Sequence, residues 1–152
     1  MRIEPHDLTG PEIAAFLEAH VTQMRAVSPP CSKHALDLEG LRASNLSFWV
    51  VRDEDGRIVG SGALKWLSSA AAELKSMRTE PNRLRSGIAT RLLVHLLAEA
   101  RGRQVNRVYL ETGSNAFFEP ARRLYEKHGF TPCPPFGDYR EDPNSAYYVL
   151  AL

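Results

Sequence analysis

The stretch from Met77 to Leu97, MRTEPNRLRSGIATRLLVHLL, constrains the fold more than any other part of the sequence. It starts at the end of a predicted strand, passes a Pro-Asn turn and a short basic loop, and continues into a helix. One face of that helix is apolar at helical spacing, through Ile88, Leu92, Leu93, Leu96 and Leu97. The stretch therefore predicts a strand, a basic loop and an amphipathic helix that packs on a sheet.

The loop between the strand and the helix is suited to bind an anion. The N-terminus of a helix presents unpaired backbone N–H groups and a partial positive charge. Arg83 and Arg85 precede this N-terminus, and Gly87 allows the backbone to approach a ligand closely. The loop matches neither the Walker motif nor the three-glycine dinucleotide motif. Since such a loop also serves in many α/β proteins only to turn the chain, its own sequence leaves both interpretations open.

The whole chain is consistent with a single domain, which we place at residues 1–152. Its formal net charge of +1 gives no overall field that would attract nucleic acid or an anionic membrane. The sequence shows no signal peptide and no apolar run long enough to span a bilayer. Cys31 and Cys133 lack metal-site spacing, so we expect free thiols, no metal and a cytoplasmic location.

Alternating and helical patterns predict an α+β fold with a mixed sheet. We expect strands near Arg2–Glu4, Phe48–Arg52, Ile58–Leu67, Ala71–Thr79, Val105–Glu111, Phe130–Cys133 and Ser145–Leu152, and helices over residues 10–27, 34–43, 88–101 and 118–128. The strand before the long helix and the strand after it must form a parallel pair with a right-handed crossover. In the strand Ala71–Thr79, simple alternation places Glu73, Lys75 and Met77 on one face.

Two motifs resemble signatures of the GCN5-related N-acetyltransferases, the GNAT superfamily. The acyl-CoA loop of that superfamily is Arg/Gln-x-x-Gly-x-Gly/Ala; Gly87 and Ala89 match it, whereas Leu84 departs from its first position. A second signature, Leu-Tyr-Glu-Lys-x-Gly-Phe, is matched from Leu124 to Phe130. Stretches such as LKSMRT, LETGS, FFEPARRLYE and PFGDYREDPNS further resemble a bacterial subgroup of unassigned substrate.

This resemblance implies a central mixed, mostly antiparallel sheet with a splayed parallel pair, flanked by about four helices. It also implies transfer of an acetyl group from acetyl-CoA to a primary amine of a small molecule, by direct attack in a ternary complex. The residues implied to hold acetyl-CoA are Met77, Arg78 and Thr79 on the strand, Arg83, Arg85, Ser86, Gly87, Ile88, Ala89 and Thr90 on the loop and helix, and Tyr125. Either Arg83 or Arg85 would reach a phosphate in place of the side chain missing at Leu84.

The implied catalytic residues are Tyr125 and Glu73. A phenol, with a pKa of about 10, can protonate a departing thiolate whose ordinary pKa is about 8.5. An ammonium has no lone pair and a pKa of about 10.4, so a base such as Glu73 is useful; the alternative is that Glu73 only pairs with Lys75. Weaker candidates for the acceptor side are Glu111, His34, Lys65 and Trp66. Phe118 occupies the place of an Asn in many GNAT members, and Asn115 lies out of register with that place.

Other functions remain compatible with the same residues. The fold could serve as an acyl-CoA-binding sensor or regulatory module, or as a protein lysine or N-terminal acetyltransferase. We expect a monomer or a homodimer, in which the strand containing Tyr147, Tyr148 and Val149 would pair across the dimer. The sequence does not specify the acceptor amine or the acyl group.

Overall fold

The computed structural model describes residues 1–27, 38–43 and 45–152. The described residues form a seven-stranded sheet in the order β1-β2-β3-β4-β5-β7-β6. Its strands are β1 (Arg2–Pro5), β2 (Leu46–Arg52), β3 (Ile58–Trp66), β4 (Ala71–Thr79), β5 (Arg107–Gly113), β6 (Thr131–Pro132) and β7 (Ser145–Ala151). Neighbouring strands are antiparallel except β4 and β5, which are parallel, so the predicted mixed sheet is confirmed.

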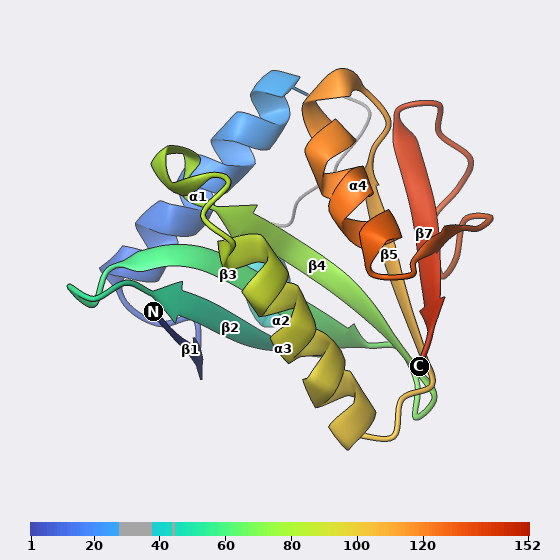
Figure 1. Cartoon of the computed structure of the whole chain (residues 1–152), viewed down its shortest axis with the longest axis horizontal. Helices are drawn as coiled ribbons and strands as arrows, with labels where there is room; N and C mark the ends of the chain where they lie inside the picture. The colour runs from blue at the N-terminus through green and yellow to red at the C-terminus, as the bar shows by residue number, and fades with distance from the viewer. Residues whose placement is uncertain (28–37, 44) are drawn as a thin grey trace.

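Helices cover both faces of this sheet (Figure 1). They are α1 (Pro11–Val27), α2 (Leu38–Ala43), α3 (Ile88–Gly102) and α4 (Glu119–Lys127), with short 3₁₀ turns η1 (Pro81–Arg83) and η2 (Ala116–Phe118). The helices α3 and α4 pack with one buried cluster, and α1 and α2 pack with a second cluster. Of the predicted helix 34–43, residues 34–37 lie outside the described residues.

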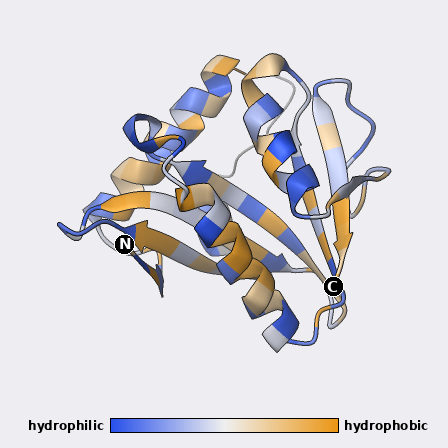
Figure 2. Cartoon of the chain, viewed as in Figure 1, coloured by the Kyte–Doolittle hydropathy of each residue, from blue (hydrophilic) through white to orange (hydrophobic). Residues whose placement is uncertain are grey.

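The helix α3 lies close to β3 because two glycines of β3 face it. A Cβ atom added to Gly62 would lie 2.8 Å from a methyl group of Leu96, and one added to Gly60 would lie 2.8 Å from a methyl group of Ile88. The backbone of β3 therefore approaches α3 closely at both glycines. Figure 2 shows apolar residues recurring along α3, which lies over the sheet, and the buried ones are Ile88, Leu92, Leu93, Leu96, Leu97 and Ala100. The position of the N-terminus of α3 over β4 depends on this contact.

A bulge in β4 changes which side chains share a face. Lys75 pairs with Ala63 and Arg78 pairs with Ser61, so Ser76 and Met77 together lie opposite the single residue Gly62. Ser76 has a φ of 55°. The extra residue reverses the alternation beyond it. Consequently Arg78 shares the face of Glu73 and Lys75 and contacts α1, whereas Met77 packs into the cluster around α3. The prediction that Met77 shares the face of Glu73 and Lys75 was wrong.

The parallel strands β4 and β5 pair over only four residues each. The register joins Ala71–Leu74 to Arg107–Leu110, after which the two strands separate (Figure 1). Beyond Leu74, the edge of β4 that faces β5 has no strand partner in the described part of the chain. Its backbone N–H and C=O groups are therefore available to a ligand that lies along β4.

We predict that Gly113→Ala destabilises the protein. A Cβ atom at Gly113, at the end of β5, would lie 2.0 Å from the ring of the buried Phe118. Relieving this overlap requires the ring or the strand to move, so the free energy of unfolding should fall by about 1–3 kcal/mol in urea denaturation. Gly102→Ala is the matched control, because no atom lies within 4 Å of its added Cβ. Equal stabilities of the two variants would contradict the prediction.

Candidate active site

A cavity of about 690 Å³ opens where β4 and β5 separate. It is bounded by β4, by the loop that leads into α3, by the end of β5, and by side chains of α1 and α4. Every residue that the sequence predicted for catalysis or coenzyme binding lines this cavity: Glu73, Met77, Arg78, Thr79, Arg83, Arg85, Ser86, Gly87, Ile88, Ala89, Thr90 and Tyr125. The fold thus brings together the two motifs that are separated in the sequence.

The loop at one end of the cavity ends in an uncapped helix N-terminus. Gly87 is the N-cap of α3 with a φ of 84°, and no side chain of the described residues caps this end of the helix. The first turn of α3 contains no acidic residue. The first backbone N–H groups of a 15-residue helix, with the positive end of its dipole, therefore remain available to an anion.

The two arginines of this loop have different surroundings. The guanidinium of Arg83 lies 3.0 Å from the carboxylate of Asp53, in the turn between β2 and β3. Hydrogen bonds from the backbone N–H groups of Arg57 and Asp55, together with the charge of Arg83, lower the pKa of Asp53. Arg85 is exposed, and no acidic side chain among the described residues lies within 4 Å of it. Of the two arginines, Arg85 is the one not already held in an ion pair.

Comparison with known proteins identifies the family. A model of the acetyltransferase (GNAT) family matches residues 13–130. The chain belongs to this family. It is 48% identical over 152 residues to YsnE of Bacillus subtilis and 46% identical over 150 residues to YedL of Escherichia coli K12, both uncharacterized N-acetyltransferases. These matches cover 100% and 99% of this chain, and 100% and 94% of the relatives.

Solved structures share the fold at low sequence identity. An acetyltransferase from Streptococcus agalactiae has a TM-score of 0.77 at 21% identity, with 99% of this chain and 98% of that chain covered. A GNAT family acetyltransferase from Elizabethkingia anophelis, solved with acetyl-CoA bound, has a TM-score of 0.71 at 16% identity, with 99% and 97% covered. The chain is thus a GNAT acetyltransferase that depends on an acyl-CoA, and the GNAT-like α+β fold is confirmed.

Tyr125 lies on the buried face of α4 and lines the cavity. Its side chain is 6% exposed, and its ring meets Phe130 edge-on at a centroid distance of 5.7 Å. Burial, with a smaller contribution from the charge of Glu111, raises the pKa of this phenol above its ordinary value. Tyr125 therefore remains protonated at neutral pH and can act as a proton donor inside this GNAT cavity.

Glu73 is held by two side chains that also line the cavity. Its Oε2 atom accepts hydrogen bonds from the Tyr139 hydroxyl at 2.6 Å and from Lys75 Nζ at 3.0 Å. The predicted pairing with Lys75 is therefore present, and it occurs at the cavity rather than away from it. Burial and the charge of Glu73 raise the pKa of Tyr139, which acts as the donor. Sequence reasoning assigned no role to Tyr139, because it reaches Glu73 from a loop 66 residues later in the chain.

The weaker candidates separate into two groups. Glu111 lines the cavity and accepts a hydrogen bond from Ser145 Oγ at 2.8 Å; Phe118 also lines it. Trp66 and Lys65 do not line the cavity. The indole N–H of Trp66 donates a hydrogen bond to Ser47 Oγ, and its ring centroid lies 4.0 Å from the guanidinium carbon of Arg103. Asn115 caps η2 by accepting from the Phe117 N–H at 3.1 Å. His34 and Cys31 lie outside the described residues.

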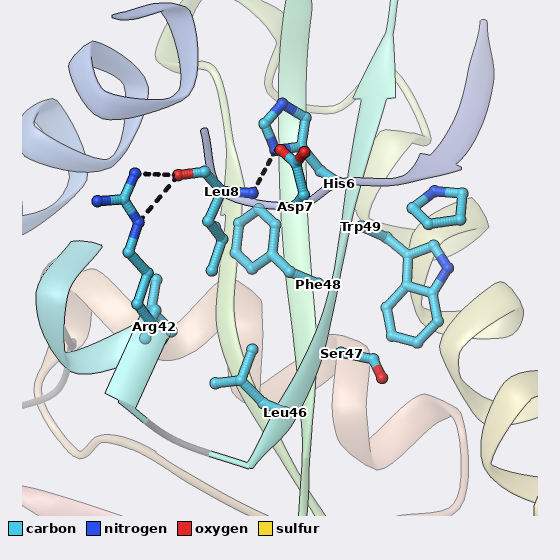
Figure 3. A pocket seen from close by; sticks show the side chains of 10 residues that line it. His6, Asp7, Leu8, Arg42, Leu46, Ser47, Phe48 and Trp49 are labelled. Carbon is cyan, nitrogen blue, oxygen red and sulfur yellow. Dashed lines mark hydrogen bonds and ion pairs between the residues drawn. The ribbon is translucent and has the colours of Figure 1, made fainter. Parts of the chain in front are cut away.

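A second cavity, of about 410 Å³, lies between β2, α2 and the segment after β1 (Figure 3). Its polar groups are largely bonded to the local backbone: the guanidinium of Arg42 donates to the carbonyl of Leu8, and His6 Nδ1 accepts from the Leu8 N–H at 2.9 Å. None of the predicted site residues lines it. Within the described part of the chain, no group of three or more His, Cys, Asp or Glu residues could hold a metal ion, and no helix could cross a membrane.

The α1 side of the larger cavity contains buried polar groups that sequence reasoning missed. His20 is 5% exposed, and its Nδ1 atom has no hydrogen-bond partner among the described residues. Burial, and next the charge of Arg78, lower its pKa to about 4. Gln23 Oε1 accepts a hydrogen bond from Arg78 at 2.6 Å. Helical spacing places His20 on the buried face of α1, but nothing in the sequence indicates that it lines the site.

We predict that His20 makes the protein less stable at acidic pH. Its pKa is about 4 when folded and about 6.5 when unfolded, so the unfolded chain binds the proton more tightly. The contribution of neutral His20 to the free energy of unfolding is complete above pH 6.5 and is lost as the pH falls toward 4. His20→Gln should therefore reduce the loss of unfolding free energy between pH 7.5 and 4.5 by on the order of 2–3 kcal/mol in urea denaturation. An unchanged loss would contradict the prediction.

Proposed function

We propose that this acetyltransferase moves the acetyl group of acetyl-CoA to a primary amine of a small molecule, by direct attack within a ternary complex. The observation that carries the proposal is a single cavity that joins the unpaired edge of β4, the uncapped N-terminus of α3 and Tyr125. The acetyl-CoA bound to the Elizabethkingia anophelis relative supports the choice of coenzyme.

The residues at the cavity fit this coenzyme. The backbone of Met77 and Thr79, on the unpaired edge of β4, would pair with the pantetheine arm as an added strand does. The N–H groups of residues 85–90 would bind the pyrophosphate at the start of α3. Arg85 is better placed than Arg83 to contact a phosphate, because Asp53 already holds the Arg83 guanidinium.

The residues that line the cavity have complementary chemical roles. Acetyl-CoA, when bound, supplies an acetyl group activated as a thioester. Glu73 would receive the proton of the incoming ammonium, directly or through water, while Tyr139 and Lys75 hold its carboxylate in place. Free N–H groups of β4 beyond Leu74 would stabilise negative charge on the acyl oxygen. Tyr125 would give its phenolic proton to the coenzyme sulfur.

The proposal predicts that Arg85 contributes more to acetyl-CoA binding than Arg83. Arg85→Gln removes a cation that is free to bind a phosphate, so the dissociation constant should rise by roughly tenfold or more. Arg83→Gln is the matched control and should change it by less than about threefold, because Arg83 is held by Asp53. Thermal unfolding measures both, since ligand at one hundred times its dissociation constant adds about 2.7 kcal/mol of stability.

If Arg83→Gln raised the dissociation constant more than Arg85→Gln did, the phosphate contact would belong to Arg83. If no CoA ester stabilised the wild-type protein, the proposed binding site itself would be refuted.

The proposal also predicts that Tyr125→Phe lowers kcat with little effect on acetyl-CoA binding. Loss of a positioned proton donor typically costs on the order of 10²- to 10⁴-fold in rate. The Phe side chain keeps the apolar packing against Phe130, so the thermal shift with acetyl-CoA should be retained. The rate is measured by release of the free thiol of CoA.

Glu73→Gln should lower kcat as well. Tyr139→Phe should lower kcat less than Glu73→Gln does, because Lys75 still holds the Glu73 carboxylate.

An unchanged kcat for Tyr125→Phe would remove Tyr125 from the mechanism. Binding of acetyl-CoA without turnover of any amine would instead favour the sensor function over the proposed transfer.

A further inference from the structure

Arg78 is a buried cation that forms no ion pair among the described residues, although the charge of Glu80 acts on it. The residue is 8% exposed and lines the cavity from β4. Its Nε atom is buried and has no hydrogen-bond partner within residues 1–27, 38–43 and 45–152. Burial lowers the pKa of its guanidinium more than the charge of Glu80 raises it, which reflects the cost of keeping this charge away from water. A buried arginine whose N–H donor lacks an acceptor lowers the stability of the fold, and a bound anion would remove this cost.

The groups around Arg78 fix its guanidinium without neutralising its charge. Gln23 Oε1 accepts one of its hydrogen bonds at 2.6 Å, and the ring of Phe16 lies 5.3 Å from its central carbon. Both residues belong to α1. His20, on the same helix, contributes a second buried atom without a partner, its Nδ1. These contacts orient the planar fork of the guanidinium, whose geometry suits two parallel hydrogen bonds to a carboxylate.

The sequence predicted Arg78 among the coenzyme-binding residues, but its side chain lies on the opposite side of the sheet from Met77 and the start of α3. The bulge at Ser76 places its side chain on the face of Glu73 and Lys75, toward α1. Met77 and the start of α3 lie on the other face. An anion bound by Arg78 therefore shares its face with the proposed general base and is separate from the pyrophosphate site.

We propose that Arg78 binds a carboxylate of the acceptor, so that the acceptor is an amino acid or another amine with a free carboxylate. This inference rests on the proposed function, in which Glu73 receives the proton of the acceptor amine. The carboxylate contacts the guanidinium of Arg78, which the Phe16 ring helps to hold, and Met24, which lines the cavity, supplies apolar surface for the rest of the molecule. The competing explanation is that Arg78 only joins α1 to β4 through Gln23.

The first test measures binding without catalysis. Thermal unfolding of the protein loaded with CoA is followed with benzoate and phenylacetate, and with the matching amides, benzamide and phenylacetamide. We expect the acids to raise the melting temperature and the amides to leave it unchanged. Arg78→Met should abolish the response, and Arg78→Lys, which keeps the charge but loses the fork, should weaken it. Arg123→Gln, on the exposed face of α4, is the control and should keep it.

The second test measures acetyl transfer to free amino acids and to their carboxamides, by release of the CoA thiol. We expect kcat/KM for the acids to exceed that for the amides by at least about tenfold in the wild type, and Arg78→Lys to reduce this ratio mainly through KM. Equal rates for acids and amides, or a ratio unchanged in Arg78→Lys, would overturn the inference. So would acids that stabilise neither the wild type nor the control.

The two tests separate this inference from the proposed function. Rapid acetylation of carboxamides would retain the proposed function and refute the role of Arg78. Stabilisation by the acids, lost in Arg78→Met, without turnover of any amine would retain the anion site and refute the proposed transfer.

Discussion

The early end of the pairing between β4 and β5 is the constraint on which the site depends. Hydrogen bonding between these parallel strands stops after Leu74 and Leu110, so one edge of β4 is left without a strand partner. A strand edge inside a fold needs hydrogen-bond partners, and here it faces a cavity rather than another strand. Because α3 and α4 lie beside the same opening, the start of α3 and Tyr125 both reach that cavity.

The bulge at Ser76 gives the two faces of β4 different roles. Without the extra residue, Met77 would follow Glu73 and Lys75 onto the α1 face. With it, Met77 packs against the cluster around α3, and Arg78 takes its place beside α1. Residues suited to hold the coenzyme therefore lie toward α3, and polar residues suited to the acceptor lie toward α1. A one-residue insertion thus separates the proposed coenzyme side from the proposed acceptor side.

Much of the fold was predictable because its signals are local. Helical spacing of leucines defined α3, alternation and turn residues defined the strands, and the strand–helix–strand order required the parallel pair. The two motifs around Gly87 and Tyr125 indicated the family, which the family comparison confirmed. The face of the sheet on which Met77 lies was not predictable. The bulge arises from the pairing of β4 with β3, and the sequence of β4 does not reveal it.

The sequence by itself determined the elements, the family and the two motifs that meet at the cavity, because each depends on spacing within a short segment. Only the tertiary structure decided which side chains contact one another there. Tyr139 reaches Glu73 from a distant loop, Gln23 reaches Arg78 from α1, and Asp53 holds Arg83 from a hairpin turn. Each of these contacts joins residues at least 30 positions apart, and whether a charge is paired depends on which distant side chain the packing brings within hydrogen-bond reach.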